Sequence, residues 1–264
     1  MAAEGGGLAL GSLAAIALGA ASAAAGPYTE AGYDPSLMAA WASSVVEVVR
    51  GPMDVAQPGL GNAGFGAETN ALGPSGSGPF DVVSLGDGGH ITLHFDTGIG
   101  DGPGDDFAVY ENGFWTLDGL FAELAFVEVS TDGVVFQRFD STSLRTTPVS
   151  GPNGEVVDPT DYHNFAGKHA RGEGTGFDLA ELGLGGVSYV RFVDAIGDGS
   201  TQDHLGAAVY DPYQTPFDSG GFDLDAVGVL HLPEPGGAAL LGSGLATLVG
   251  LARRRREAAC EPAR

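Results

Sequence analysis

Residues 99–114 read Ile-Gly-Asp-Gly-Pro-Gly-Asp-Asp-Phe-Ala-Val-Tyr-Glu-Asn-Gly-Phe, an acidic, glycine-rich loop that runs into an alternating strand. Asp101, Asp105 and Asp106 lie in the loop, and Glu111 follows at the far end of the strand. Carboxylates and the backbone carbonyls that glycine leaves accessible are oxygen ligands of the kind that calcium prefers. The spacing does not fit an EF-hand. The stretch therefore predicts a calcium-stabilised β-domain, with an acidic surface loop as the alternative.

Two further acids, Asp223 and Asp225, lie just before a predicted strand over residues 226–230. Like charges that cluster repel one another, and few basic side chains are available to neutralise them. A bound divalent cation would remove this repulsion. The complete set of predicted calcium ligands is Asp101, Asp105, Asp106, Glu111, Asp223 and Asp225.

Composition limits the possible functions. The chain has 264 residues, with 11 Lys and Arg against 34 Asp and Glu and a formal net charge of −23. A surface this negative repels nucleic acid and anionic membranes, and it favours divalent cations. The 45 glycines lack the period of three of collagen, so this composition favours many short strands joined by turns. The single cysteine, Cys260, cannot form a disulfide within the chain.

Alternation of apolar and polar residues predicts the first strands. In residues 90–95, Ile91, Leu93 and Phe95 share one face, which we assign to the core. Residues 107–112 carry apolar side chains on both faces, so this strand is predicted to be covered on both sides.

A β-hairpin is predicted where residues 125–131 and 134–139 flank Asp132-Gly133. Strands dispersed among long Gly- and Pro-rich loops, without alternating helices, indicate an all-β fold, an antiparallel jelly-roll-type β-sandwich. The predicted core comprises Ile91, Leu93, Phe95, Phe107, Val109, Val127, Val129, Val190, Phe192 and Val227.

One short amphipathic helix is predicted near residues 35–50. Asp34 and Pro35 form a start signal, and a Gly-Pro pair at residues 51–52 forms a stop signal. Between them, apolar residues recur at helical spacings of three, four and three: Met38, Trp41, Val45 and Val48. Residues 52–80 follow as a predicted irregular loop.

The N-terminal end has the pattern of a secretory signal peptide. Residues 8–20 are apolar, and residues 21–25 are small and offer an Ala-x-Ala cleavage site. We predict a signal peptide over residues 1–25, with an alanine-rich buried helix as the alternative. Residues 26–232 are then the exported β-sandwich domain.

The C-terminal end has three features in order. Pro233-Glu234-Pro235 comes first, and residues 236–252 follow without a charged side chain. Seventeen residues at about 1.5 Å rise reach roughly 25 Å, enough for a thin bilayer, so they predict a C-terminal transmembrane helix. The arginine cluster that comes next would stay cytoplasmic, as would the tail over residues 257–264. The cluster is Arg253, Arg254, Arg255 and Arg256.

This order of features resembles the PEP-CTERM sorting signal of Gram-negative bacteria, here over residues 233–256. The resemblance implies recognition by an exosortase, a membrane transpeptidase. The protein would be held transiently in the cytoplasmic membrane by residues 236–252, cleaved near the Pro-Glu-Pro motif, and sent to the cell surface or the extracellular matrix. A simple C-terminal membrane anchor is the alternative.

The middle of the chain resembles a family of bacterial cell-surface proteins. Its motifs here are Ala-Leu-Gly-Pro at residues 71–74, Val-Ser-Leu-Gly at 83–86, Gly-Asp-Asp-Phe at 104–107 with Tyr-Glu-Asn at 110–112, Phe-Val-Glu-Val-Ser at 126–130 and Gly-Phe-Asp-Leu-Asp-Ala-Val at 221–227. The domain of that family resembles discoidin-like, galactose-binding sandwiches. The resemblance implies a jelly roll, often calcium-bound, with a carbohydrate-binding role and no catalytic residues.

Three functions are compatible with the sequence. No Gly-x-Ser-x-Gly elbow, His-Glu-x-x-His motif or Walker loop occurs in the sequence. We therefore expect a non-catalytic surface module that binds carbohydrate or exopolysaccharide, with ligand-binding residues unassigned. The alternatives are an extracellular carboxylate-dependent hydrolase and a purely structural matrix protein.

Overall fold

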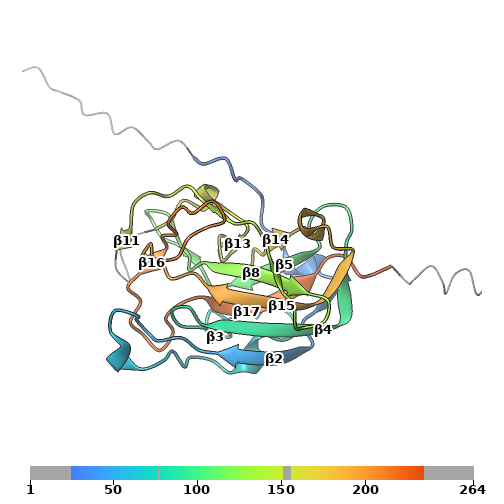
Figure 1. Cartoon of the computed structure of the whole chain (residues 1–264), viewed down its shortest axis with the longest axis horizontal. Coiled ribbons are helices and arrows are strands. Elements are labelled where there is room, and N and C mark those ends of the chain that lie inside the picture. The colour runs from blue at the N-terminus through green and yellow to red at the C-terminus, as the bar shows by residue number, and fades with distance from the viewer. Residues whose placement is uncertain (1–24, 77, 151–155, 235–264) are drawn as a thin grey trace, which may run out of the picture.

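The computed structural model describes residues 25–76, 78–150 and 156–234, and β-strands form its framework (Figure 1). The strands are β1 (Ala40–Trp41), β2 (Ser44–Val49), β3 (Val83–Ser84), β4 (His90–Gly100), β5 (Phe107–Glu111), β6 (Phe114–Trp115), β7 (Leu120–Phe121), β8 (Ala125–Ser130), β9 (Gln137–Arg138), β10 (Thr142–Ser143), β11 (Val149–Ser150), β12 (Tyr162–His163), β13 (Phe165–Ala166), β14 (Thr175–Phe177), β15 (Gly186–Asp194), β16 (Pro212–Tyr213) and β17 (Asp223–Val229). Short 3-10 turns lie between them: η1 (Pro35–Leu37), η2 (Pro58–Leu60), η3 (Glu68–Ala71), η4 (Pro159–Asp161) and η5 (Leu179–Leu182). Within these described ranges no helix has the length and apolar character needed to cross a membrane.

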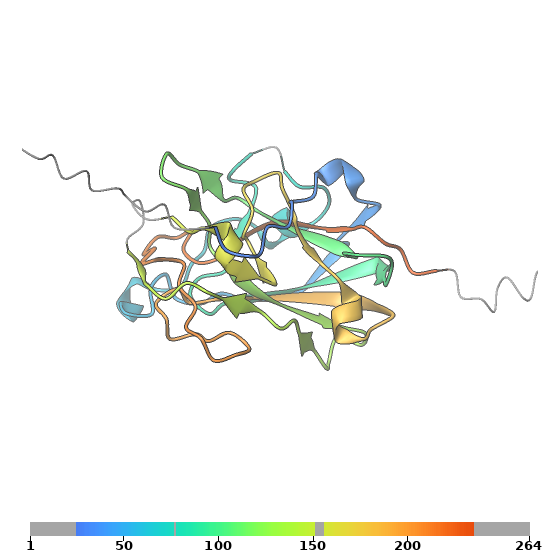
Figure 2. The same ribbon diagram turned by 90° about the horizontal axis from the view of Figure 1, so that it is seen from above.

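Two larger sheets carry the core. One has the strand order β1-β17-β5-β14, with β3 also paired to β17, and the other has the order β13-β8-β15-β4-β2, with β9 paired to β8. The pairs within these two sheets are antiparallel. Seen from above, the sheets form two stacked layers (Figure 2). The prediction of an all-β, antiparallel, sandwich-like fold is confirmed at this level.

Apolar side chains between the two sheets form the main core. The Phe107 ring of β5 stacks on Phe177 of β14 with ring centroids 5.3 Å apart, and Phe139 meets both rings edge-on. The core prediction is confirmed, because all ten of its residues lie in one buried cluster. They are Ile91, Leu93, Phe95, Phe107, Val109, Val127, Val129, Val190, Phe192 and Val227.

The predicted hairpin is confirmed as a pair of neighbouring strands, since Glu128 of β8 pairs with Arg138 of β9. Its connection is longer than the Asp-Gly pair alone, because β9 begins only at Gln137. The Asp132 carboxylate organises that connection by accepting hydrogen bonds from the N–H groups of Val134 and Val135.

The predicted helix near residues 35–50 is wrong. Asp34 does begin a helical turn, because its Oδ1 accepts a hydrogen bond from the Ser36 N–H at 2.8 Å. That turn is only η1, and β1 and β2 follow it. The run Ser-Val-Val-Glu-Val-Val over residues 44–49 is rich in β-branched side chains, which favour a strand.

A β-bulge explains why this strand has the apolar spacing of a helix. Val45 pairs with Leu93 and Val48 with Ile91, and the register shifts between Val45 and Glu47. In a regular strand, residues three apart point to opposite faces. The extra residue of the bulge restores them to one face, so both valines pack against the core.

Lys168 holds the N-terminal segment over residues 25–34 against the sandwich. Its side chain is 3% exposed, and the ammonium donates hydrogen bonds to Glu30 at 2.7 Å and to the carbonyl oxygens of Tyr28 and Tyr162 at 3.2 and 2.8 Å. The Tyr28 ring also stacks on His163, with centroids 4.8 Å apart. These contacts fix the segment that follows the predicted signal peptide.

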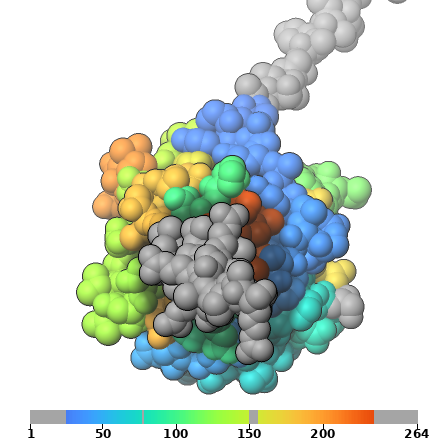
Figure 3. Space-filling model, turned by 90° about the vertical axis from the view of Figure 1, so that its right-hand side faces the viewer, coloured from blue at the N-terminus to red at the C-terminus, as the bar shows by residue number. Residues whose placement is uncertain are grey.

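After β17 the chain reaches the surface at one end of the sandwich, where it is orange-red in Figure 3. Pro233 and Glu234 are exposed there. The remaining predicted segments lie outside the described residues: the signal peptide up to residue 24, Pro235, the transmembrane helix over residues 236–252, Arg253 to Arg256 and the tail over residues 257–264.

Candidate functional site

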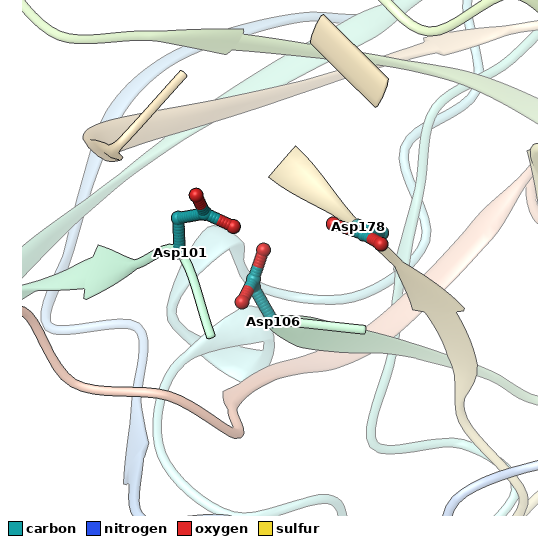
Figure 4. Close-up of side chains that lie close together, drawn as sticks. All are labelled: Asp101, Asp106 and Asp178. Carbon is teal, nitrogen blue, oxygen red and sulfur yellow. The ribbon is translucent and has the colours of Figure 1, made fainter. Parts of the chain in front are cut away.

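The loop between β4 and β5 crosses from one sheet to the other, and it places two acids beside a third from a distant part of the chain. Asp101, Asp106 and Asp178, here called the Asp101 cluster, each offer a carboxylate oxygen, and these atoms lie within 4.8 Å of one another. Figure 4 shows the three carboxylates turned toward a common centre. Asp178 is the residue immediately before η5.

Backbone hydrogen bonds hold the Asp101 cluster in place. The two oxygens of the buried Asp106 accept from the N–H groups of Gly102 and Leu179, each at 2.7 Å. Asp178 caps η5 by accepting from the Ala180 N–H at 2.8 Å. Burial raises the pKa of Asp106, and the charges of Asp178 and Asp101 raise it further. An oxygen-only set of this kind suits calcium, and Asp101 leaves one side open to solvent.

The structure divides the six predicted ligands among several places. A strand rises about 3.4 Å per residue, so Asp106 and Glu111 at the two ends of β5 are roughly 17 Å apart and cannot share one ion. Asp105 lies beside the Tyr33 hydroxyl. Asp225 accepts hydrogen bonds from Ser75 and Gly76 at 2.5 and 2.8 Å. Of the six predicted ligands, only Asp101 and Asp106 therefore belong to the Asp101 cluster.

Glu111 and Asp223 belong to a second, buried group of acids at the other end of β5. Glu111 accepts a hydrogen bond from the Gly113 N–H at 2.6 Å. Asp223 accepts from the Ser84 hydroxyl and from the Asn112 amide, the latter at 3.0 Å. The five members of this group, here called the buried acids, are Glu111, Glu123, Asp194, Asp211 and Asp223.

Burial raises the pKa of every one of the buried acids. It raises the pKa of Asp194 to about 7 and that of Asp223 to about 6. The pKa values of Glu111, Glu123 and Asp211 lie well above their ordinary range, because repulsion between neighbouring carboxylates adds to the cost of burial.

Glu123 differs from the other buried acids because none of the described residues donates a hydrogen bond to its carboxylate. Asp194 accepts from two backbone N–H groups, and Asp211 accepts from the Leu124 N–H at 2.8 Å. The Glu123 side chain is 5% exposed, yet no hydrogen bond or ion pair to it occurs within the described part of the chain. The sequence did not predict Glu123 as a site residue, because a single Glu between Ala122 and Leu124 has the same local pattern whether it is buried or exposed.

Glu123 and Asp223 open into a cleft of about 320 Å³ beside the β6–β7 hairpin. Its other polar groups are Asn112, Thr215 and Ser219. Its aromatic residues, here called the cleft aromatics, are Phe80, Phe114, Phe121 and Phe217.

The cleft aromatics leave much apolar surface in water. Phe80 is 73% and Phe114 54% exposed, and the Phe114 ring stacks on Phe121 with centroids 5.1 Å apart. Trp115 and Leu117 extend this exposed surface along the hairpin. Exposed apolar patches beside fixed polar groups are typical of ligand-binding surfaces.

Comparison with known proteins adds no assignment. No protein-family model matches the chain, and no curated protein matches its sequence.

Proposed function

We propose that this chain is an exported, non-catalytic cell-surface protein whose β-sandwich binds extracellular carbohydrate in the cleft. The observation that carries the proposal is that the cleft aromatics line the same cleft as the polar side chains of Glu123, Asp223 and Asn112. A sugar ring presents an apolar C–H face that packs on aromatic rings, and it presents hydroxyls that hydrogen-bond to carboxylates and amides.

Calcium and the finer fold belong to the same proposal. The sandwich is of the jelly-roll, galactose-binding-like kind, and calcium in the Asp101 cluster stabilises it. The oxygen ligands and the mutual repulsion of their charges support that ion. Calcium there would tie two segments together: the β4–β5 loop, which joins the two sheets, and the start of η5.

The destination we propose is the cell surface or extracellular matrix of a Gram-negative bacterium, reached with an exosortase as partner. The exposure of Pro233 and Glu234 beyond β17 supports this, since a protease must reach the chain there. The net charge of −23 argues against nucleic acid as a partner. The transient membrane contact would be made by residues 236–252.

Carbohydrate binding is tested by titrating the exported protein with bacterial exopolysaccharide fragments and measuring the heat of binding. Phe114→Ala should weaken binding about tenfold, a loss of roughly 1.4 kcal/mol, because it removes the exposed ring of the hairpin. The matched control is Val134→Ala, which truncates an exposed apolar side chain in the β8–β9 connection. Equal affinities of wild type and Phe114→Ala would contradict the assignment of the cleft.

One observation favours the hydrolase as a second candidate. Glu123 and Asp223 are two carboxylates with raised pKa values in one cleft, and glycosidases use such a pair as acid and base or nucleophile. Release of reducing ends from exopolysaccharide by wild type, abolished in Glu123→Gln, would favour this candidate over binding alone.

A further inference from the structure

We propose that the floor of the cleft holds a second divalent cation, bound between the carboxylates of Glu123 and Asp223, and that carbohydrate hydroxyls bind to this cation. The site lies at the opposite end of β5 from the Asp101 cluster. The part that concerns carbohydrate rests on the proposed function, and the cation site itself does not.

The first observation is the missing partner of Glu123. A buried polar group without a hydrogen bond costs free energy, and an isolated buried charge costs more. Glu123 is 5% exposed and lines the cleft, and none of the described residues donates a hydrogen bond to it. Its carboxylate oxygens therefore face the cleft with no donor among the described residues, and they are available to bind a cation.

The second observation is that the surroundings of Glu123 add negative charge. Its charged neighbours are Asp223, Glu111, Asp211 and Asp194. No ion pair within the described residues involves any of these five acids. The positive charge of Arg50 reaches Asp223, but its guanidinium is already bonded to three backbone carbonyl oxygens at 2.6 to 2.8 Å. A cation would supply the positive charge that the described residues do not place beside Glu123.

The third observation is that Asp223 is held ready in a fixed orientation. The Ser84 hydroxyl and the Asn112 amide each donate to a different oxygen of its carboxylate. Each oxygen keeps a further lone pair for a cation. Asn112 is itself fixed by donating to the Pro79 carbonyl at 3.0 Å. Support of a ligand by surrounding hydrogen bonds is what metal sites require.

The choice of cation follows from the ligand atoms. Carboxylates, an amide and the hydroxyls of Thr215 and Ser219 are the polar groups that line the cleft, and such oxygen ligands suit calcium better than zinc or copper. Because the cleft opens to solvent, some coordination positions face outward. Vicinal hydroxyls of a sugar can replace water in those positions.

The test measures calcium bound per chain in the full-length protein by equilibrium dialysis at pH 7.5. Glu123→Gln should bind one calcium fewer than wild type, and Asp178→Asn should keep the cleft ion. The same calcium stoichiometry in Glu123→Gln as in wild type would overturn the proposal. Asp223→Asn serves as the second variant if Glu123→Gln does not fold, and it should also lose one calcium.

Carbohydrate binding is measured in the same variants to separate the two claims. Chelator and Glu123→Gln should each weaken it about tenfold or more, whereas Asp178→Asn should not. If no carbohydrate binds to wild type, the proposed function fails and the calcium stoichiometry still decides the cation site. Carbohydrate binding that survives in Glu123→Gln while one calcium is lost would overturn the claim that the cation contacts the sugar.

Discussion

At the scale of single residues, the described part of the chain is distinguished by several acids that are buried without an ion pair. Asp87 is one example: it is buried and lines neither the Asp101 cluster nor the cleft, although its charge reaches Asp194 and Asp211. Its carboxylate accepts a hydrogen bond from the Val55 N–H at 2.7 Å. Burial, with the charges of Asp54 and Asp198, raises its pKa to about 6. Such a group makes stability depend on pH in a direction opposite to that of a salt-bridged carboxylate.

The direction of this pH dependence follows from the number of protons that the folded and unfolded states bind. Between about pH 4 and 6, folded Asp87 holds a proton that the unfolded chain releases, so unfolding becomes easier as pH rises. The contribution is fully favourable below pH 4 and is lost by pH 6. We expect Asp87→Asn, which keeps the acceptor for Val55, to raise the free energy of unfolding at pH 8 by about 1 to 2 kcal/mol.

Urea unfolding at pH 4 and at pH 8 measures this effect. The control is Asp140→Asn, which neutralises an exposed carboxylate and should leave the pH dependence almost unchanged. If Asp87→Asn and wild type lose the same stability between the two pH values, the buried charge of Asp87 does not control the pH dependence of stability.

The residues of the two candidate sites differ in whether they could be predicted from the sequence. Asp101 and Asp106 could be chosen as candidate ligands from sequence, because a glycine-rich loop with several acids is typical of a cation site, and the structure brings them together. Asp178 was not, since its place beside them depends on the pairing of β14 with β5. Glu123 was not either, because burial defines its role and no local pattern predicts burial of a charged residue.

At the scale of elements, β2 shows why periodicity alone misleads. The ten predicted core residues are confirmed, because alternation reports which face is buried wherever a stretch of strand is regularly paired, even in β15 and β17, whose register shifts elsewhere. In β2 a single bulge converts a period of two into a spacing of three between Val45 and Val48. Bulges depend on the partner strand, so the sequence of residues 44–49 alone does not reveal this one.

A pair of valine truncations tests the strand. Val48 packs against the core, whereas Val46 in the same strand is 54% exposed. Val48→Ala should cost about 1 kcal/mol of unfolding free energy, and Val46→Ala should change it by less than about 0.5 kcal/mol. In a helix Ala is favoured over Val, so a clear stabilisation by Val46→Ala, measured by urea unfolding, would contradict the assignment of β2.

At the scale of the whole molecule, β5 organises the charge. It lies in the middle of its sheet, with all five residues buried, and it separates the Asp101 cluster from the buried acids. The sequence predicted that acids flank this strand, but the two sites could be distinguished only once the sheet order was known. A chain with a net charge of −23 repels itself when folded, so a cation bound at either end of β5 would offset part of this repulsion.

Calcium should therefore raise the melting temperature of the chelator-stripped protein. A ligand that binds only the folded state adds about 2.7 kcal/mol at a hundred times its dissociation constant. Asp178→Asn should lose the part of this gain that comes from the Asp101 cluster, because the substitution removes a charged ligand and keeps a residue that can cap η5. Asp118→Asn, which neutralises an exposed acid outside both groups, should keep the full gain.

Sodium chloride at equal ionic strength separates ion binding from screening, because screening acts on all surface charges alike. Millimolar calcium that leaves the melting temperature where sodium chloride leaves it would show that the Asp101 cluster is an acidic surface loop.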